Sequence, residues 1–176
     1  SHKYDPISHK EYYQFFAFWH DKNEIFGHCT AHLFSIEFQK RGASHYHFLK
    51  WIKDFELTFH NVDCIIWSQD YDREKNGPSL HELVTKFMIH TCGSYCLNKN
   101  GICSKHFPHE FSDETIIGEG AFVKYRRRSR TDWGRTFKKM VNKTETMIDN
   151  RWVVPYSPFL LLKYQSHINV ECRATV

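Results

Sequence analysis

The chain has 176 residues, of which 41% are hydrophobic and 16% aromatic, so it can bury the core of about one domain and is not disordered over most of its length. Its formal net charge of +4, from 24 Lys plus Arg and 20 Asp plus Glu, permits a polyanionic partner without indicating one. No apolar run approaches the roughly 18 residues that cross a bilayer, so we expect no membrane span.

The first third of the sequence predicts a helix followed by a β-hairpin. A capping box precedes aromatic residues at helical spacing, which predicts a helix over residues 9–20. Residues 32–38 alternate between apolar and polar side chains, and residues 45–52 form a second strand-like run. Residues 40–44 contain a glycine and supply turn chemistry between them, so we expect the two strands to pair.

The rest of the chain mixes helical and strand patterns. A capping box at Ser79 begins the clearest helical pattern, because apolar residues follow at i, i+3, i+4 and i+7 spacing. Ser157 before Pro158 is typical of a helix N-terminus and predicts a helix over residues 159–165. Short strands are predicted at residues 62–68, 152–154 and 168–172. We therefore expect residues 1–176 to form a single α+β domain.

The six cysteines divide into two groups. Cys29, Cys64 and Cys172 stand alone in apolar segments, where a thiol usually behaves as a small buried hydrophobe. Cys92, Cys96 and Cys103 cluster in a stretch without periodicity, and three thiols cannot all pair among themselves. With His90 or His106 they offer the ligands of a structural zinc site in an insert near residues 90–110. The alternative is three free thiols in a surface loop.

Two histidines in the second predicted strand indicate a different metal site. His45 and His47 are two residues apart and therefore share one face of a strand. If Gly42 centres the hairpin, Gln39 lies opposite His45 and Glu37 lies opposite His47. Two imidazoles and an oxygen ligand are typical of a divalent ion with open coordination positions. The alternatives are an ordinary amphipathic strand, or an Fe(II) oxygenase site formed by His45, His47 and Glu37.

The densest basic run of the sequence lies in its second half, with two further residues, Trp133 and Arg135, close behind it. Arginine and aromatic side chains together suit single-stranded DNA, because guanidinium groups pair with phosphates and aromatic rings stack on bases. A solvated loop or a nuclear-import signal explains the charge equally well. Arg41, at the tip of the predicted hairpin, is a further candidate for a phosphate contact. The candidate residues in the run are Arg126, Arg127, Arg128 and Arg130.

Several blocks of the sequence, in order, carry a family resemblance. The segment from His32 to His47 contains Glu37-Phe38-Gln39-Lys40-Arg41-Gly42 followed by His45-Tyr46-His47. Further blocks are Met88-Ile89-His90 with Cys92-Gly93, Cys103-Ser104-Lys105 before Phe107-Pro108, Tyr125-Arg126-Arg127-Arg128, Asn150 to Pro158, and His167 to Glu171. Together they resemble the replication-initiator (Rep) domain of Helitron transposases, which are rolling-circle enzymes of the HUH endonuclease superfamily.

The resemblance implies a central antiparallel sheet with flanking helices and a metal-dependent reaction on single-stranded DNA. It implies that His45, His47 and Gln39 hold Mg or Mn. Glu37 remains the alternative third ligand, because a carboxylate suits these ions better than an amide does. A tyrosine hydroxyl would attack the phosphorus, leaving a 5′-phosphotyrosine intermediate in strand nicking and joining. The resemblance also favours His90, Cys92, Cys96 and Cys103 as the zinc ligands, and it implies a nuclear location and a helicase domain in the parent protein.

The tyrosine motif is where this sequence departs from the family. Its nucleophilic tyrosines follow the block that resembles His167 to Glu171, whereas this sequence ends at Val176 without such a motif. Tyr156 and Tyr164 precede that block and are expected to be packing residues. We therefore identify no catalytic nucleophile, and we expect a nuclease domain truncated at its C-terminus or a catalytically inactive nucleic-acid-binding relic of a transposable element.

Overall fold

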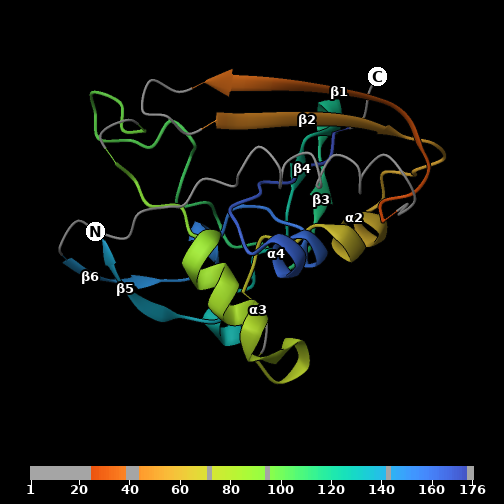
Figure 1. Ribbon diagram of the computed structural model, residues 1–176. Helices are drawn as coiled ribbons and strands as arrows, with labels where there is room; N and C mark the ends of the chain where they lie inside the picture. Colours follow the sequence, from red (N-terminus) through yellow and green to blue (C-terminus); the bar gives the residue numbers. More distant parts are fainter. Residues whose placement is uncertain (1–24, 39–43, 71–72, 94–95, 142–143, 174–176) are drawn as a thin grey trace. The chain divides into compact units, whose positions relative to one another are not determined.

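The computed structural model describes residues 25–38, 44–70, 73–93, 96–141 and 144–173 (Figure 1). The chain groups into two compact units, Ser1–Glu56 and Leu57–Val176, and each is described by itself. The α+β class is confirmed, whereas the single domain stays a prediction. The helix predicted over residues 9–20 lies outside the described residues. Within the described ranges, no helix combines the length and apolar character needed to cross a membrane.

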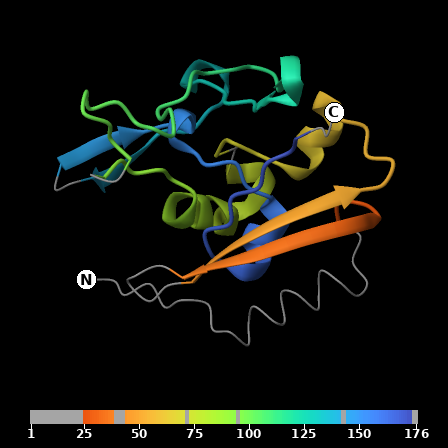
Figure 2. The same cartoon turned by 90° about the horizontal axis from the view of Figure 1, so that it is seen from above.

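The first unit contains the predicted β-hairpin. β1 (Cys29–Phe38) pairs antiparallel with β2 (Ser44–Ile52), and the strands run side by side in both views (Figures 1 and 2). The register places Glu37 opposite His45 and Ser35 opposite His47, not Gln39 and Glu37 as expected. The expected register was wrong because the two strands pair two residues away from it, with Phe38 opposite Ser44 as the last described pair.

The core of the second unit forms around two of the predicted helices. α3 (Arg73–Phe87) contributes its buried residues Leu80 and Val84, and α4 (Pro158–Tyr164) contributes Leu161. α4 confirms the predicted helix, with Ser157 at its N-cap and Pro158 in its first turn. α3 begins at Arg73, six residues before the predicted capping box at Ser79, and it includes Gly77 and Pro78, which seldom lie inside a helix.

The segment predicted as a strand over residues 62–68 is mostly helical. α2 (Phe59–Ile65) begins after Thr58, whose side chain accepts a hydrogen bond from the Asn61 N–H at 3.2 Å. Val62 and Ile66 are both buried, at 0% and 2% exposure, and their spacing of four residues fits a helix face. The strand prediction was wrong because β-branched residues at this spacing also occur in buried strands.

The remaining elements are short. The described strands form three two-stranded sheets, and the central sheet that the resemblance implies is not confirmed among them. Residues predicted as a strand at 152–154 contain only a single bridge, from Val153 to Ile89, and residues 168–172 form no strand. The other elements are β3 (Ile116–Ile117), η1 (Glu119–Ala121), β4 (Val123–Lys124), η2 (Arg130–Asp132), β5 (Phe137–Val141), β6 (Thr144–Ile148) and η3 (Asn150–Trp152).

Candidate functional site

The predicted zinc ligands come together in the second unit. One ligand atom from each of His90, Cys92, Cys96 and Cys103 lies within 4.8 Å of the others. The His90 Nε2 atom is 3.4 Å from the Cys92 Sγ and 3.3 Å from the Cys103 Sγ. Ligand atoms on a tetrahedral zinc ion are separated by about 3.5–3.8 Å, given bonds of about 2.0–2.3 Å. The group can therefore hold a metal ion such as zinc.

The core fixes the position of His90. Its backbone N–H donates to the Trp152 carbonyl at 2.9 Å, and the adjacent Ile89 forms the bridge with Val153. Its ring stacks on Phe107, with centroids 4.2 Å apart. Burial, followed by the nearby charge of Lys105, lowers the pKa of His90 below its ordinary value. The imidazole is therefore held in the neutral form that binds a metal.

A short turn brings Cys96 and Cys103 together. Leu97 pairs with Cys103, and the Ser104 N–H donates to the Cys96 carbonyl at 2.6 Å. Gly101 has a φ of 75°, a conformation that favours glycine and closes the turn. The Gly93 N–H lies 3.3 Å from the Cys96 Sγ, where it can donate to a thiolate.

The environments of the thiols differ in their effect on ionisation. Burial, reinforced by hydrogen bonds with Cys103 and Cys96, raises the pKa of the Cys92 thiol to about 12. Burial acts in the same direction on Cys103, but hydrogen bonds from the backbone of Phe107 and Lys105 outweigh it and lower its pKa. The surroundings of Cys103 therefore favour its thiolate, the form that ligates zinc, more than those of Cys92 do.

The lone cysteines are less buried than predicted. Cys64 is exposed, and Cys29 and Cys172 are half-buried. The prediction for Cys64 was wrong because α2 turns this residue toward solvent, where its Sγ lies 4.0 Å from the His60 Nε2. None of the three belongs to a metal-capable group among the described residues.

A second group of metal-capable side chains lies on the β1–β2 hairpin. One ligand atom from each of Glu37, His45 and His47 lies within 4.8 Å of the others. Glu37 is directly opposite His45 in the ladder and diagonal to His47, whose Nε2 is 3.5 Å from the Glu37 Oε2. Gln39 and Arg41, the other two residues predicted here, lie outside the described residues. His45 and His47 therefore lie together on one face of the hairpin, as predicted, and the oxygen ligand beside them is Glu37, the alternative.

This hairpin group is open to solvent. The side chains of His47 and Glu37 are 62% and 67% exposed. Two imidazoles and a carboxylate form a donor set that suits a divalent transition ion, and three ligands leave coordination positions open for other groups. The residues present therefore fit a divalent ion with an accessible coordination sphere.

The basic run is not a continuous charged surface. Arg127 is only 4% exposed, and its Nη1 atom contacts the carbonyl oxygens of Ser68, Asn150 and Val153 at 3.2, 2.8 and 2.5 Å. Burial lowers the pKa of Arg127 to about 10, which still leaves it charged at neutral pH. The assignment of Arg127 to DNA binding was wrong because its guanidinium is occupied inside the fold.

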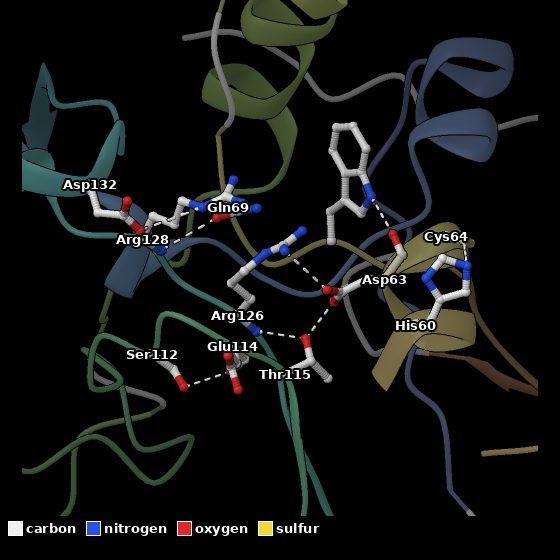
Figure 3. A network of polar contacts seen from close by, with 11 residues as sticks. His60, Asp63, Cys64, Gln69, Ser112, Glu114, Thr115, Arg126, Arg128 and Asp132 are labelled. Atoms are coloured by element: carbon white, nitrogen blue, oxygen red, sulfur yellow. Dashed lines mark hydrogen bonds and ion pairs between the residues drawn. The ribbon is translucent and has the colours of Figure 1, made fainter. Parts of the chain in front are cut away.

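The neighbouring arginines point to acidic partners (Figure 3). The Arg126 Nη1 is 3.2 Å from the Asp63 Oδ2, and the Arg128 Nε is 3.6 Å from the Asp132 Oδ2. Both side chains are only partly exposed, at 26% and 20%. Arg130 is exposed and remains the strongest candidate of the run for a phosphate contact.

Tyr156 is a packing residue, as the resemblance implies. It is 1% exposed, and its hydroxyl donates to the Gln69 carbonyl at 3.1 Å. Burial also raises its pKa far above the ordinary value. Burial raises the pKa of Tyr164 as well. Neither hydroxyl is prepared to act as a nucleophile.

Sequence reasoning missed one buried acid–base pair. The Asp70 carboxylate is 2.6 Å from the His81 Nδ1 and is 3% exposed, and the Asp70 N–H donates to the Asn150 Oδ1 at 2.7 Å. Burial raises the pKa of Asp70, while His81 and Arg135 oppose that shift. The pair attaches the segment after α2 to α3, a tertiary contact that no local pattern could indicate.

Fold and site together define an α+β protein with a Cys/His group that can hold a metal ion such as zinc. Neither the comparison with protein-family models nor the search of curated proteins finds a match to this sequence. Function is therefore inferred from the residues of the chain.

Proposed function

We propose that this chain is a Rep-like domain of the HUH type, which binds single-stranded DNA and a divalent Mg or Mn ion for strand nicking and joining. The observation that supports this most directly is the convergence of Glu37, His45 and His47 on one exposed face of the β1–β2 hairpin. The ordered sequence blocks that resemble Helitron Rep domains support the same proposal.

The hairpin residues would position the ion against the DNA backbone. His45 and His47 share a strand face and supply two imidazole ligands, and Glu37 supplies a carboxylate from the paired strand. A divalent ion bound there would act as a Lewis acid on a phosphodiester. The exposure of the group allows an extended single strand of DNA to approach it. We assign no nucleophile among the described tyrosines.

The same donor set raises a second candidate, an Fe(II) oxygenase, because two histidines and a carboxylate also hold non-haem iron. Oxygen chemistry requires an enclosed site that excludes water from reactive intermediates. The His47 and Glu37 side chains are 62% and 67% exposed, so this group is open to water rather than enclosed. The openness of the group therefore favours a polymeric substrate over a small enclosed cosubstrate.

Calorimetric titration of the zinc-loaded protein with Mn²⁺ tests the proposed metal group. We expect the wild-type chain to bind Mn²⁺ at one site and the His45→Ala/His47→Ala variant to lose the binding heat. His32→Ala is the matched control, because residue 32 lies on the other face of β1, and it should leave the titration unchanged. Undiminished Mn²⁺ affinity in the double variant would show that the metal group is misassigned.

A further inference from the structure

Trp133 is unusually exposed for a tryptophan. It is 76% exposed, the highest value among the large hydrophobic side chains in the described part of the chain. Tryptophan normally buries much of its large apolar surface against a core or a partner. This side chain therefore presents a ring face to solvent that the fold itself does not use.

The backbone holds Trp133 in this outward position. The residue follows η2 and has a φ of 62°, a left-handed conformation that is rare for a bulky side chain. The Ser129 carbonyl accepts hydrogen bonds from the N–H groups of Asp132 and Gly134, at 3.0 and 2.8 Å, which closes the turn. A Cβ at Gly134 would lie 2.1 Å from the Arg128 carbonyl oxygen, so only glycine permits this closure. Residues in such conformations are enriched at active sites and ligand-binding sites, so the turn is a candidate for one.

The charges around the turn suit a polyanion. Arg130 is exposed at the start of η2, three residues from Trp133. The Asp132 carboxylate lies 3.6 Å from the Arg128 Nε, so the neighbouring negative charge is already compensated. An exposed indole three residues from an exposed guanidinium matches the chemistry of single-stranded nucleic acid, in which bases stack and phosphates pair with cations.

We propose that Trp133 is a stacking platform for one base of single-stranded DNA and that Arg130 contacts the adjacent phosphate. This inference rests on the proposed function, because it names how the bound strand is held. It assigns a sequence-tolerant contact, since every base presents a π face to the indole.

Fluorescence anisotropy with a labelled oligo(dT) strand and the full-length, zinc-loaded chain tests the contact. Trp133→Ala should weaken binding about tenfold, within the range expected for losing one base–aromatic stack, whereas Trp133→Phe should retain most of the affinity. Phe122→Ala is the control, because Phe122 is also an exposed aromatic residue, at 65%, outside this turn. On an oligonucleotide whose bases are replaced by abasic sites, wild type and Trp133→Ala should bind equally.

The outcomes separate the inference from the proposed function. If the wild-type chain does not bind oligo(dT), both are overturned. If it binds and Trp133→Ala binds as tightly, the stacking platform is wrong while the proposed function stands, and the exposed indole would then suit a protein partner. An equal loss in Phe122→Ala would also overturn the inference. Equal urea midpoints for the variants would show that the losses do not come from unfolding.

Discussion

Arg127 and Arg130 belong to the same basic run, yet the structure gives them different roles. The Arg127 guanidinium is buried and contacts three backbone carbonyl oxygens, which joins the segment after α2 to the residues after β6. Arg130 is exposed. A buried guanidinium that satisfies carbonyl oxygens contributes to folding, whereas an exposed one is available to phosphates.

Substitution of Arg127 should therefore lower stability, whereas substitution of Arg130 should weaken DNA binding. Arg127→Met should lower the free energy of unfolding by about 3 kcal/mol, because three buried carbonyl oxygens lose their donor. Arg130→Gln should change the free energy of unfolding by less than about 0.5 kcal/mol. The substitution should instead weaken single-stranded DNA binding and lower the number of counterions released on binding by about one. Urea denaturation and salt-dependent anisotropy measure both effects. Normal stability combined with lost DNA binding in Arg127→Met would contradict this assignment.

At the scale of elements, the Cys/His segment depends on a metal more than on packing. Between His90 and His106 most described residues are exposed or half-buried, and Cys103 is the only buried one. Such a segment gains little from hydrophobic burial, so ligand bonds to a metal ion would supply its order.

The zinc content of the protein should depend on the residues of the Cys/His group and not on the other cysteines. We expect the wild-type chain to carry about one zinc ion and Cys103→Ser to carry almost none, because a tetrahedral site needs all four ligands. Cys64→Ser is the matched control, since Cys64 is exposed and lies outside the group. Metal analysis, together with the absorption spectrum of the cobalt-substituted protein, measures this. Equal zinc content in the two variants would rule the group out as the zinc site.

Long patterns predicted elements well, and short ones did not. The β1–β2 hairpin and helix α3 follow from sustained alternation or helical spacing, whereas the short α4 was predicted from its Ser157-Pro158 start signal. α2 was missed because Val62 and Ile66 satisfy two periodicities, and only the Thr58 cap favours the helix. The hairpin register was missed because it depends on where the turn closes, and a glycine does not fix that position.

The candidate sites likewise divide into residues that local patterns predict and residues that they do not. The zinc ligands could be found from the sequence because they are clustered within one segment, and the histidine pair because residues two apart share a strand face. The burial of Arg127 and the Asp70–His81 contact could not be found in this way. Both depend on segments that are distant in sequence and meet only in the tertiary structure.

At the scale of the whole molecule, the described residues of each compact unit include one metal-capable group, and the two groups differ in chemistry. The first unit holds the exposed Glu37–His45–His47 group, whose open coordination suits a substrate. The second unit holds the sulfur-rich group that suits structural zinc, together with the exposed Trp133 and Arg130. The proposed function requires that the ion in the first unit contacts the DNA that the protein binds.

The affinity of the zinc-loaded chain for single-stranded DNA, measured with and without added Mn²⁺, tests this requirement most directly. If the ion contacts the phosphodiester, Mn²⁺ should raise the affinity of the wild-type chain about tenfold, a typical coupling between linked ligands, and the gain should disappear in His45→Ala/His47→Ala. An equal gain in the double variant, or no gain in the wild-type chain, would contradict the account.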